Sequence, residues 1–170
     1  MRLGHVELDN CVCENLADVL FCEKLSIERM RERVRDMPDC VEQVMGGLEV
    51  SLARRDWDSF EAYLLAAHEF PAFSYSDALI GALEMRSELV PNEDVLQVLS
   101  YIGDPETLPV LRETLWWRPV WDEFDQVAVK CIWAIGSIRN RSARDVLLEV
   151  IEYGSEPMRD WARSKLSWAI

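Results

Sequence analysis

The sequence predicts an all-α protein, a short α-solenoid of antiparallel helix pairs with an N-terminal helical cap. Three observations predict this fold: a block that recurs 36 positions along the chain, apolar residues at helical spacing, and turn residues at matching places in both copies. The block VLQVLSYIGDPETLPVLRETL (residues 95–115) aligns without a gap with CIWAIGSIRNRSARDVLLEVI (residues 131–151). Repeated units of two apolar helical faces joined by a tight turn are typical of solenoids, because each unit buries its apolar face only against its neighbours.

The two copies share their apolar positions and a helix-capping residue at the turn. The aligned pairs are Leu99 and Ile135, Ile102 and Ile138, Val110 and Val146, Leu111 and Leu147, Leu115 and Ile151, and Asp104 and Asn140. Shared apolar positions at helical spacing predict the residues that face the core in both units.

Length and composition fit a single α-helical domain spanning residues 1–170. With 49% hydrophobic residues, the chain can bury a core that needs neither a metal nor disulfides. Within this domain we expect an N-terminal helical part over residues 1–91 and repeats over residues 92–170. The sequence leaves open whether the N-terminal part contains further repeats.

The sequence of the N-terminal part predicts paired helices, and no repeat is evident among them. Apolar spacing predicts helices over residues 13–25, 27–37, 41–55, 60–70 and 75–85. Pro38 and Pro71 are expected to end the second and fourth of these segments, because proline cannot continue a helix. The Gly46–Gly47 pair weakens the third, since each glycine costs roughly 1 kcal/mol relative to alanine.

Polar side chains that can accept hydrogen bonds from free backbone amides mark the expected helix starts in this part. Asp39 followed by Glu42 has the spacing of a capping box for the third helix. Asp58 with Glu61 is expected to begin the fourth helix, and Ser74 to cap the fifth.

Turn chemistry is clearer in the C-terminal half. Asp104 can accept hydrogen bonds from the first amides of the next helix, and Asn140 occupies the same place in the second copy. Gly154 is expected to end the second copy's last helix. The final segment, MRDWARSKLSWAI (residues 158–170), matches the first helix of a third unit, and we expect it to cover the open end of the core.

The first copy carries the skeleton L-x-x-I-G-D-P-x-x-x-P-x-L-x-x-x-L over residues 99–115, and residues 158–162 read MRDWA. This skeleton resembles the HEAT-like repeats of the phycobilisome-lyase type, and MRDWA is similar to the V-R-x-x-A start of such a unit. The second copy departs from the pattern at the glycine and at both prolines, which are replaced by Arg139, Arg141 and Asp145. The resemblance covers roughly the second half of the chain. It implies an α-solenoid and carries no catalytic residues.

Residues with catalytic or metal-binding chemistry are few and scattered. One histidine and three cysteines near the N-terminus could supply metal ligands: His5, Cys11, Cys13 and Cys22. Their spacing matches no standard zinc pattern, and cysteine is more often a small buried residue. The other histidine, His68, is interpreted as a partly buried helix residue. Without a glycine-rich phosphate loop or a nucleophile elbow, we expect no catalytic residue, no metal and no cofactor.

The cysteines and the N-terminus indicate a cytoplasmic protein. Five cysteines, an odd number without a disulfide framework, are explained most simply as reduced thiols. The first residues, MRLGHVELDN, carry charges where a secretory signal peptide would have its apolar run. No segment is long or apolar enough to predict a membrane span.

Net charge defines the kind of partner that the protein can attract. With 31 acidic and 18 basic residues, the formal charge is −13, which repels nucleic acid and anionic membranes and attracts a basic protein. Residues 84–125 hold ten acids and three arginines, whereas residues 126–170 hold seven bases and five acids. Acids at helix starts explain part of the acidic segment, and an interaction surface is the alternative for the rest. Arg139, Arg141 and Arg144 form a basic patch at the second turn, interpreted as a solvated turn or an anion site.

Aromatic residues concentrate in the connector LWWRPVWDEFD (residues 115–125). One interpretation places Trp116 in the core and uses Trp121 to staple the next helix; the other leaves Trp117 and Trp121 exposed as binding anchors. We combine the exposed aromatic rings with the neighbouring acids into one candidate partner-binding surface. It comprises Trp117, Trp121, Glu88, Glu93, Asp94, Asp122, Glu123 and Asp125.

These features favour a non-catalytic protein-binding module that grips one basic protein partner. The most concrete form is a bacterial immunity protein that neutralises a toxin domain, because toxins directed at nucleic acid are basic and an acidic inhibitor can imitate their substrate. The alternative is a lyase-like or chaperone-like protein that acts in cofactor attachment or complex assembly, as the family resemblance implies. The sequence does not define the oligomeric state.

Overall fold

Every regular element that the structure describes is helical, as the sequence predicts. The computed structural model describes residues 15–21, 27–37 and 39–166. The α-helices are α1 (Leu16–Leu20), α2 (Ile27–Arg35), α3 (Cys40–Arg54), α4 (Trp57–Glu69), α5 (Ser76–Glu84), α6 (Asn92–Ile102), α7 (Leu108–Leu115), α8 (Gln126–Ser137), α9 (Arg141–Tyr153) and α10 (Glu156–Leu166). Short 3-10 turns, η1 (Phe73–Tyr75) and η2 (Pro105–Thr107), precede α5 and α7.

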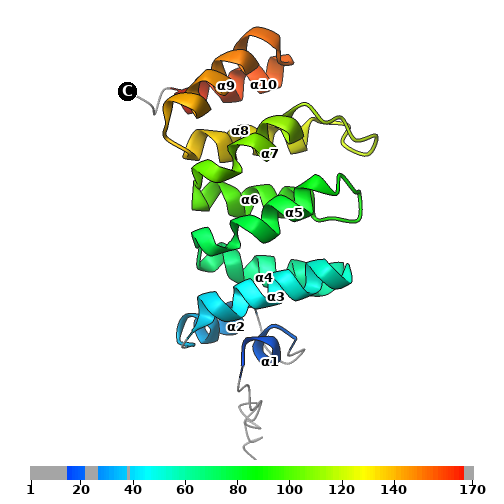
Figure 1. Cartoon of the computed structure of the whole chain (residues 1–170), viewed down its shortest axis with the longest axis vertical. Helices are drawn as coiled ribbons and strands as arrows, with labels where there is room; N and C mark the ends of the chain where they lie inside the picture. The colour runs from blue at the N-terminus through cyan, green and yellow to red at the C-terminus, as the bar shows by residue number, and fades with distance from the viewer. Residues whose placement is uncertain (1–14, 22–26, 38, 167–170) are drawn as a thin grey trace, which may run out of the picture.

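From α3 onward the helices lie in pairs that follow one another along the long axis of the molecule (Figure 1). Helices α4, α6, α8 and α10 form one row, in which each contacts the next. Helices α3, α5 and α7 form a second row beside it. Helices α1 and α2 lie at the N-terminal end of the stack, against α3 and α4.

The apolar positions shared by the two sequence copies lie in the core. Leu99 and its counterpart Ile135 are buried, as are Leu111 and Leu147. They belong to one buried cluster that runs from Leu16 in α1 to Ala162 in α10. Because burying one such aliphatic side chain contributes about 1.5–3 kcal/mol, the repeated apolar positions stabilise the packing of successive helices.

The predicted caps of both repeat turns are confirmed. The Asp104 side chain accepts a hydrogen bond from the Glu106 amide at 3.0 Å, and Asn140 accepts one from the Ala143 amide at 2.8 Å. Gly103 ends α6 in the left-handed region, at φ 65°, which favours glycine. The second copy has arginine at this place, and α8 instead ends at Ile138 with a negative φ of −75°.

Two of the caps predicted in the N-terminal part are wrong. Asp39 precedes α3 in a left-handed conformation, and its side chain makes no capping hydrogen bond. Since Ncap residues usually have extended backbone, the residue spacing alone could not establish the capping box. Ser74 lies inside η1, so α5 follows from Tyr75 without a side-chain cap.

The start of α4 differs from the prediction by two residues. Asp56, rather than Asp58, is the cap, because its Oδ1 accepts from the Ser59 amide at 3.2 Å. Its Oδ2 also accepts from the Ser59 hydroxyl at 2.6 Å. The two aspartates flank Trp57, and the backbone conformation determines which one caps α4.

The glycine pair does not interrupt α3, which runs unbroken from Cys40 to Arg54. A Cβ atom at Gly47 would collide with the ring of Tyr63 on α4, whereas one at Gly46 would meet nothing. Gly47 therefore allows close packing of α3 on α4, and the packing offsets its low helix propensity.

The C-terminal helix packs on the end of the stack. Helix α10 contacts α8 and α9, and Met158 and Ala162 on its inner face are fully buried. Gly154 caps the preceding helix, as predicted. Trp161 is 40% exposed and packs edge-on against Trp133 at 5.1 Å.

Candidate protein-binding surface

Between α4 and α9, helix connections of two kinds lie at opposite ends of the helix pairs (Figure 1). Tight turns join α4 to α5, α6 to α7 and α8 to α9, and we call this the turn end. Longer loops, residues 85–91 and 116–125, join α5 to α6 and α7 to α8. We call the end of the helix pairs where these loops and the first turn of α6 lie the loop end. All eight predicted binding residues belong to the loop end, either to its two loops or to the first turn of α6.

The loop end exposes large apolar side chains. Val120 is fully exposed, Phe124 is 76% exposed and Leu89 is 66% exposed. Exposed apolar residues that gather in one region commonly mark a binding surface. Sequence reasoning did not select these three residues, because no helical or strand periodicity distinguishes an apolar loop residue from a buried one.

A pocket of about 370 Å³ brings four of the predicted residues together. We call it the loop-end pocket. It is lined by Glu88, Val90, Pro91, Asn92, Glu93, Asp94 and Trp121. Trp121 comes from the α7–α8 loop, and the other residues come from the α5–α6 loop and the start of α6. Stacking of successive helix pairs therefore places an aromatic ring beside three carboxylates.

The carboxylates of this pocket are only partly neutralised. Glu93 pairs with Lys130 of α8, at 3.3 Å between Oε2 and Nζ. Glu88 and Asp94 are exposed and make no ion pair within the part of the chain that the structure describes. The pocket therefore keeps a negative potential that can attract a cation.

The two tryptophans of the candidate surface have different environments. Trp117 is partly buried against the core, and its ring meets that of Trp121 edge-on at 6.2 Å. Trp121 is 38% exposed and lines the loop-end pocket. Trp117 thus supports the ring of Trp121, which is the better placed of the two to contact a partner. Trp116, as one interpretation of the sequence expected, packs against the core.

Two predicted binding residues have structural partners inside the chain. The Asp122 carboxylate accepts from the amides of Gln126 and Val127 at 2.7 and 2.9 Å, so it caps α8. Asp125 accepts from the Ser155 hydroxyl at 3.0 Å and lies 3.5 Å from Nε of Arg118.

The remaining acid of the connector and the arginine beside it have different roles. Glu123 is exposed and makes no ion pair among the described residues. The Arg118 guanidinium donates to the carbonyl oxygens of Leu115 and Trp117 at 2.9 and 3.0 Å. These bonds restrain the conformation of the loop, and such restraint would lower the entropy lost if the loop bound a partner.

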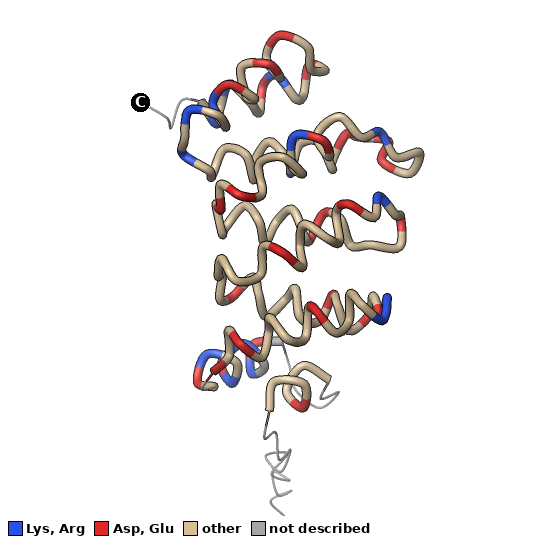
Figure 2. The backbone as a smooth tube through the Cα atoms, viewed as in Figure 1, with Lys and Arg blue, Asp and Glu red and all other residues tan. Residues whose placement is uncertain are grey.

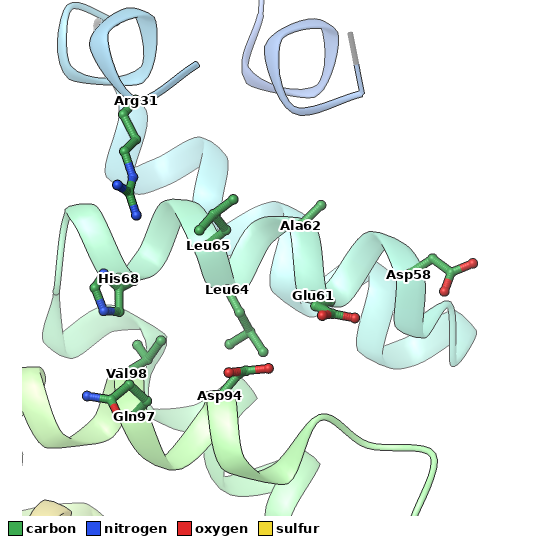
Figure 3. Close-up of a pocket in the computed structure, with 10 residues that line it drawn as sticks. All are labelled: Arg31, Asp58, Glu61, Ala62, Leu64, Leu65, His68, Asp94, Gln97 and Val98. Carbon is green, nitrogen blue, oxygen red and sulfur yellow. The ribbon is translucent and has the colours of Figure 1, made fainter. Parts of the chain in front are cut away.

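A second pocket, of about 480 Å³, lies between α2, α4 and α6 (Figure 3). Its charged lining includes Asp58 and Glu61 of α4, Asp94 of α6, and Arg31 of α2. In Figure 3 the carboxylate of Asp94 faces that of Glu61 across the space between the two helices. Asp94 lines both pockets, so the acidic surface continues from the loop end along the α4–α6 row.

Two residues that line this second pocket, Arg31 and His68, already have neighbours. Arg31 pairs with Glu69 at 2.9 Å, which reduces its positive contribution. His68 is partly buried, as the sequence predicts, and its ring packs edge-on against Tyr101 at 4.6 Å.

Metal-binding groups are not assembled in the described ranges, where no three His, Cys, Asp or Glu side chains could hold an ion together. The sequence candidates for metal ligands lie outside those ranges: His5, Cys11, Cys13 and Cys22. Cys40 and Cys131 are buried free thiols, and burial raises the pKa of both.

Charge is distributed unevenly over the molecule (Figure 2). Arg139, Arg141 and Arg144 are exposed at the α8–α9 turn, which belongs to the turn end. The acidic loop end and this basic turn thus lie on opposite ends of the helix pairs.

Within the described ranges, every helix is too short or too polar to traverse a lipid bilayer. Comparison of the chain with protein-family models, with curated proteins and with solved structures gives no match. The resemblance to HEAT-like repeats and the function that it implies therefore stay predictions.

Proposed function

We propose that the protein is a short α-solenoid of HEAT-like repeats that binds one basic protein partner through its loop end, without catalysis. In its most concrete form it is a cytoplasmic bacterial immunity protein that neutralises a basic toxin domain.

The solenoid assignment is supported by the repeat and by the packing of the helices. The first copy corresponds to α6 and α7, and the second to α8 and α9. Helix α10 continues the row of α6 and α8. Stacked pairs whose apolar faces are buried against their neighbours have the properties of a solenoid.

The observation that carries the binding function is the loop-end pocket with its exposed surroundings. Trp121 lies beside Glu88 and Asp94, which have no ion pair among the described residues. Val120 and Phe124 project from the same loop. Protein-binding hot spots commonly combine an aromatic anchor with apolar neighbours and a charged rim.

The charge of the whole protein favours a basic partner. A net charge of −13 accelerates encounter with a cationic surface and slows encounter with phosphate-rich molecules. Toxins that act on nucleic acid need a cationic surface, so an acidic protein can occupy that surface.

Affinity purification from the native host at low salt, about 50 mM, tests this proposal. The tagged protein should retain a basic protein, and raising the salt should slow association while affecting dissociation much less. Recovery of no basic protein, or association that is insensitive to salt, would contradict the proposal.

A matched pair of variants assigns the binding to the loop end. Glu88→Gln with Asp94→Asn removes two negative charges from the loop-end pocket. Asp77→Asn with Glu106→Gln removes two exposed charges from the turn end. The first pair should slow association more than the second, because nearby charges steer the encounter more strongly than distant ones.

A further inference from the structure

The side chain of Arg118 joins the α7–α8 loop to other parts of the molecule. Its Nη1 donates to the carbonyl oxygens of Leu115 and Trp117 at 2.9 and 3.0 Å. Its Nη2 donates to Sδ of Met158 on α10 at 3.2 Å, and its Nε lies 3.5 Å from the Asp125 carboxylate. All three nitrogens of the guanidinium therefore have partners inside the chain, although the side chain is 44% exposed.

A second contact ties the end of this loop to the start of α10. The Asp125 carboxylate accepts a hydrogen bond from the hydroxyl of Ser155, the residue before α10, at 3.0 Å. Asp125 has a left-handed backbone conformation, at φ 56°, which is uncommon for a residue other than glycine. Such a conformation persists only where the surrounding contacts hold it. The contacts of Arg118 and Asp125 thus hold the loop on both sides of its tip.

The tip of the loop, residues 119–122, forms a turn between these fixed points. The Asp122 amide donates to the Pro119 carbonyl oxygen at 3.1 Å, and the proline ring fixes φ at that residue. The Asp122 side chain also caps α8. Val120, which is fully exposed, and Trp121 are the central residues of the turn. Two apolar side chains that reach solvent thus stand on a short segment whose ends are both held.

Restraint of this tip favours recognition more than stability. Exposed ion pairs contribute little to stability, and Val120 gains no burial from an ordered loop because it is fully exposed. Binding gains more, since a loop that already has its bound shape loses less conformational entropy on association. The charge of Arg118 acts in the opposite direction, because a cation at the loop end repels a basic partner. Geometry rather than charge therefore explains an arginine at this place.

We propose that Arg118 is a positioning residue, which holds the tip of the α7–α8 loop against α10 so that Val120 and Trp121 meet the partner in one prearranged shape. The role in binding rests on the proposed function, whereas the restraint of the tip does not. The two parts are therefore tested separately, without and with the partner.

Amide hydrogen exchange of the free protein, followed by NMR, tests the restraint. Arg118→Ala should raise the exchange rate of the Asp122 amide at least about fivefold, because the turn opens more often. The Ala143 amide at the α8–α9 turn should change by less than about twofold, since Arg118 does not contact that turn. Arg112→Ala, which breaks a 2.8 Å ion pair between α7 and α9, is the matched control and should leave the Asp122 rate unchanged. Arg118→Lys keeps the charge but not the planar set of donors, so it should also raise the Asp122 rate.

Affinity for the purified basic partner tests the role in binding. Arg118→Ala should weaken binding roughly three- to tenfold, although loss of a positive charge would by itself strengthen it. In a background with both Val120→Ala and Trp121→Ala, the same substitution should change the affinity by less than about twofold, because Arg118 acts through the side chains that it positions. A residue that only stabilised the fold would weaken binding equally in both backgrounds.

The restraint and the role in binding fail by different results. An unchanged Asp122 rate in Arg118→Ala, or an equal rise at Ala143, would overturn the restraint. If the Asp122 rate rises while the affinity stays equal or increases, the role of Arg118 in binding falls and the proposed function stands. If no basic partner is recovered, the proposed function and the role in binding fall together, and the exchange rates still decide the restraint.

Discussion

Acidic residues at the turn end and at the loop end include side chains with different roles, as Asp104 shows when it is compared with Glu88 and Asp94. At the turn end, Asp104 is 7% exposed and accepts from the Ser76 hydroxyl at 2.6 Å and from the Glu106 amide. At the loop end, Glu88 and Asp94 face solvent and a pocket. Acidic composition alone therefore does not mark a binding site. Carboxylates that line a pocket together with an aromatic ring are the more specific signal.

Both ends depend on the same core. The alkylation rate of Cys131 of α8 tests whether that core is closed, and this experiment has the largest expected effect. This thiol is fully buried, so alkylation should be at least about a thousandfold slower in the native protein than in urea. Mass spectrometry of the labelled peptides distinguishes Cys131 from the other cysteines. Labelling at similar rates in both conditions would contradict a closed core at α8.

Burial of Cys131 also predicts how stability depends on pH. Burial raises the pKa of this thiol above its unfolded value of about 8.5. The unfolded chain then loses this proton before the folded chain does, so the contribution to stability is present below about pH 8.5 and is lost as the pH rises further. Urea titrations at neutral and alkaline pH should show the decrease, and Cys131→Ala should reduce it.

Removing the buried carboxylate of Asp104 at the turn end should lower the stability more than removing an exposed carboxylate from the loop end. Asp104→Ala deletes a helix cap and leaves the buried Ser76 hydroxyl without its acceptor, so the free energy of unfolding should fall by about 2–4 kcal/mol. Glu88→Ala should change it by less than about 0.5 kcal/mol. Urea denaturation measures both, and equal losses would contradict the distinction between the ends.

The two repeat turns should also differ from each other. Asn140 is exposed, and among the described residues its side chain accepts a hydrogen bond only from the Ala143 amide. Asn140→Ala should therefore lower the free energy of unfolding by about 1 kcal/mol, which is less than the loss at Asp104. The same denaturation experiment checks this order. A larger loss at Asn140 would show that burial of the cap is not the deciding factor.

The smallest effect on stability is expected for exposed aromatic residues. Phe124 at the loop end and Phe73 at the turn end are 76% and 64% exposed. Replacing either with alanine should change the free energy of unfolding by less than about 0.5 kcal/mol. Only Phe124→Ala should weaken binding of the basic partner. Comparable weakening by Phe73→Ala would place the interface elsewhere or make it much larger.

Some local features of this fold could be predicted from the sequence, whereas others depend on the backbone conformation. The cap at Asp104 acts on an amide two residues away, so spacing and residue type suffice to predict it. The choice between Asp56 and Asp58 depends on backbone conformation, which spacing does not determine. The prediction for this helix start was therefore wrong by two residues.

The candidate site likewise combines features that could be predicted from the sequence with features that could not. Trp121, Glu88, Glu93 and Asp94 were selected from aromatic and acidic composition, and the structure places all four around one pocket. The contact of Arg118 with Met158 was not foreseen, because the two residues lie 40 positions apart in the sequence. Sequence reasoning also could not separate Asp125 from the free acids, because its partner Ser155 lies 30 residues away in the sequence.

Two tryptophans of nearly equal exposure allow the most direct test of binding through the loop end. Trp121 is 38% exposed and Trp161 of α10 is 40% exposed. The measurement is the affinity of the purified basic partner for Trp121→Ala and for Trp161→Ala. Binding through the loop end predicts a loss of at least about tenfold for Trp121→Ala and a change within about twofold for Trp161→Ala. Wild-type affinity of Trp121→Ala, or an equal loss in both variants, would contradict it.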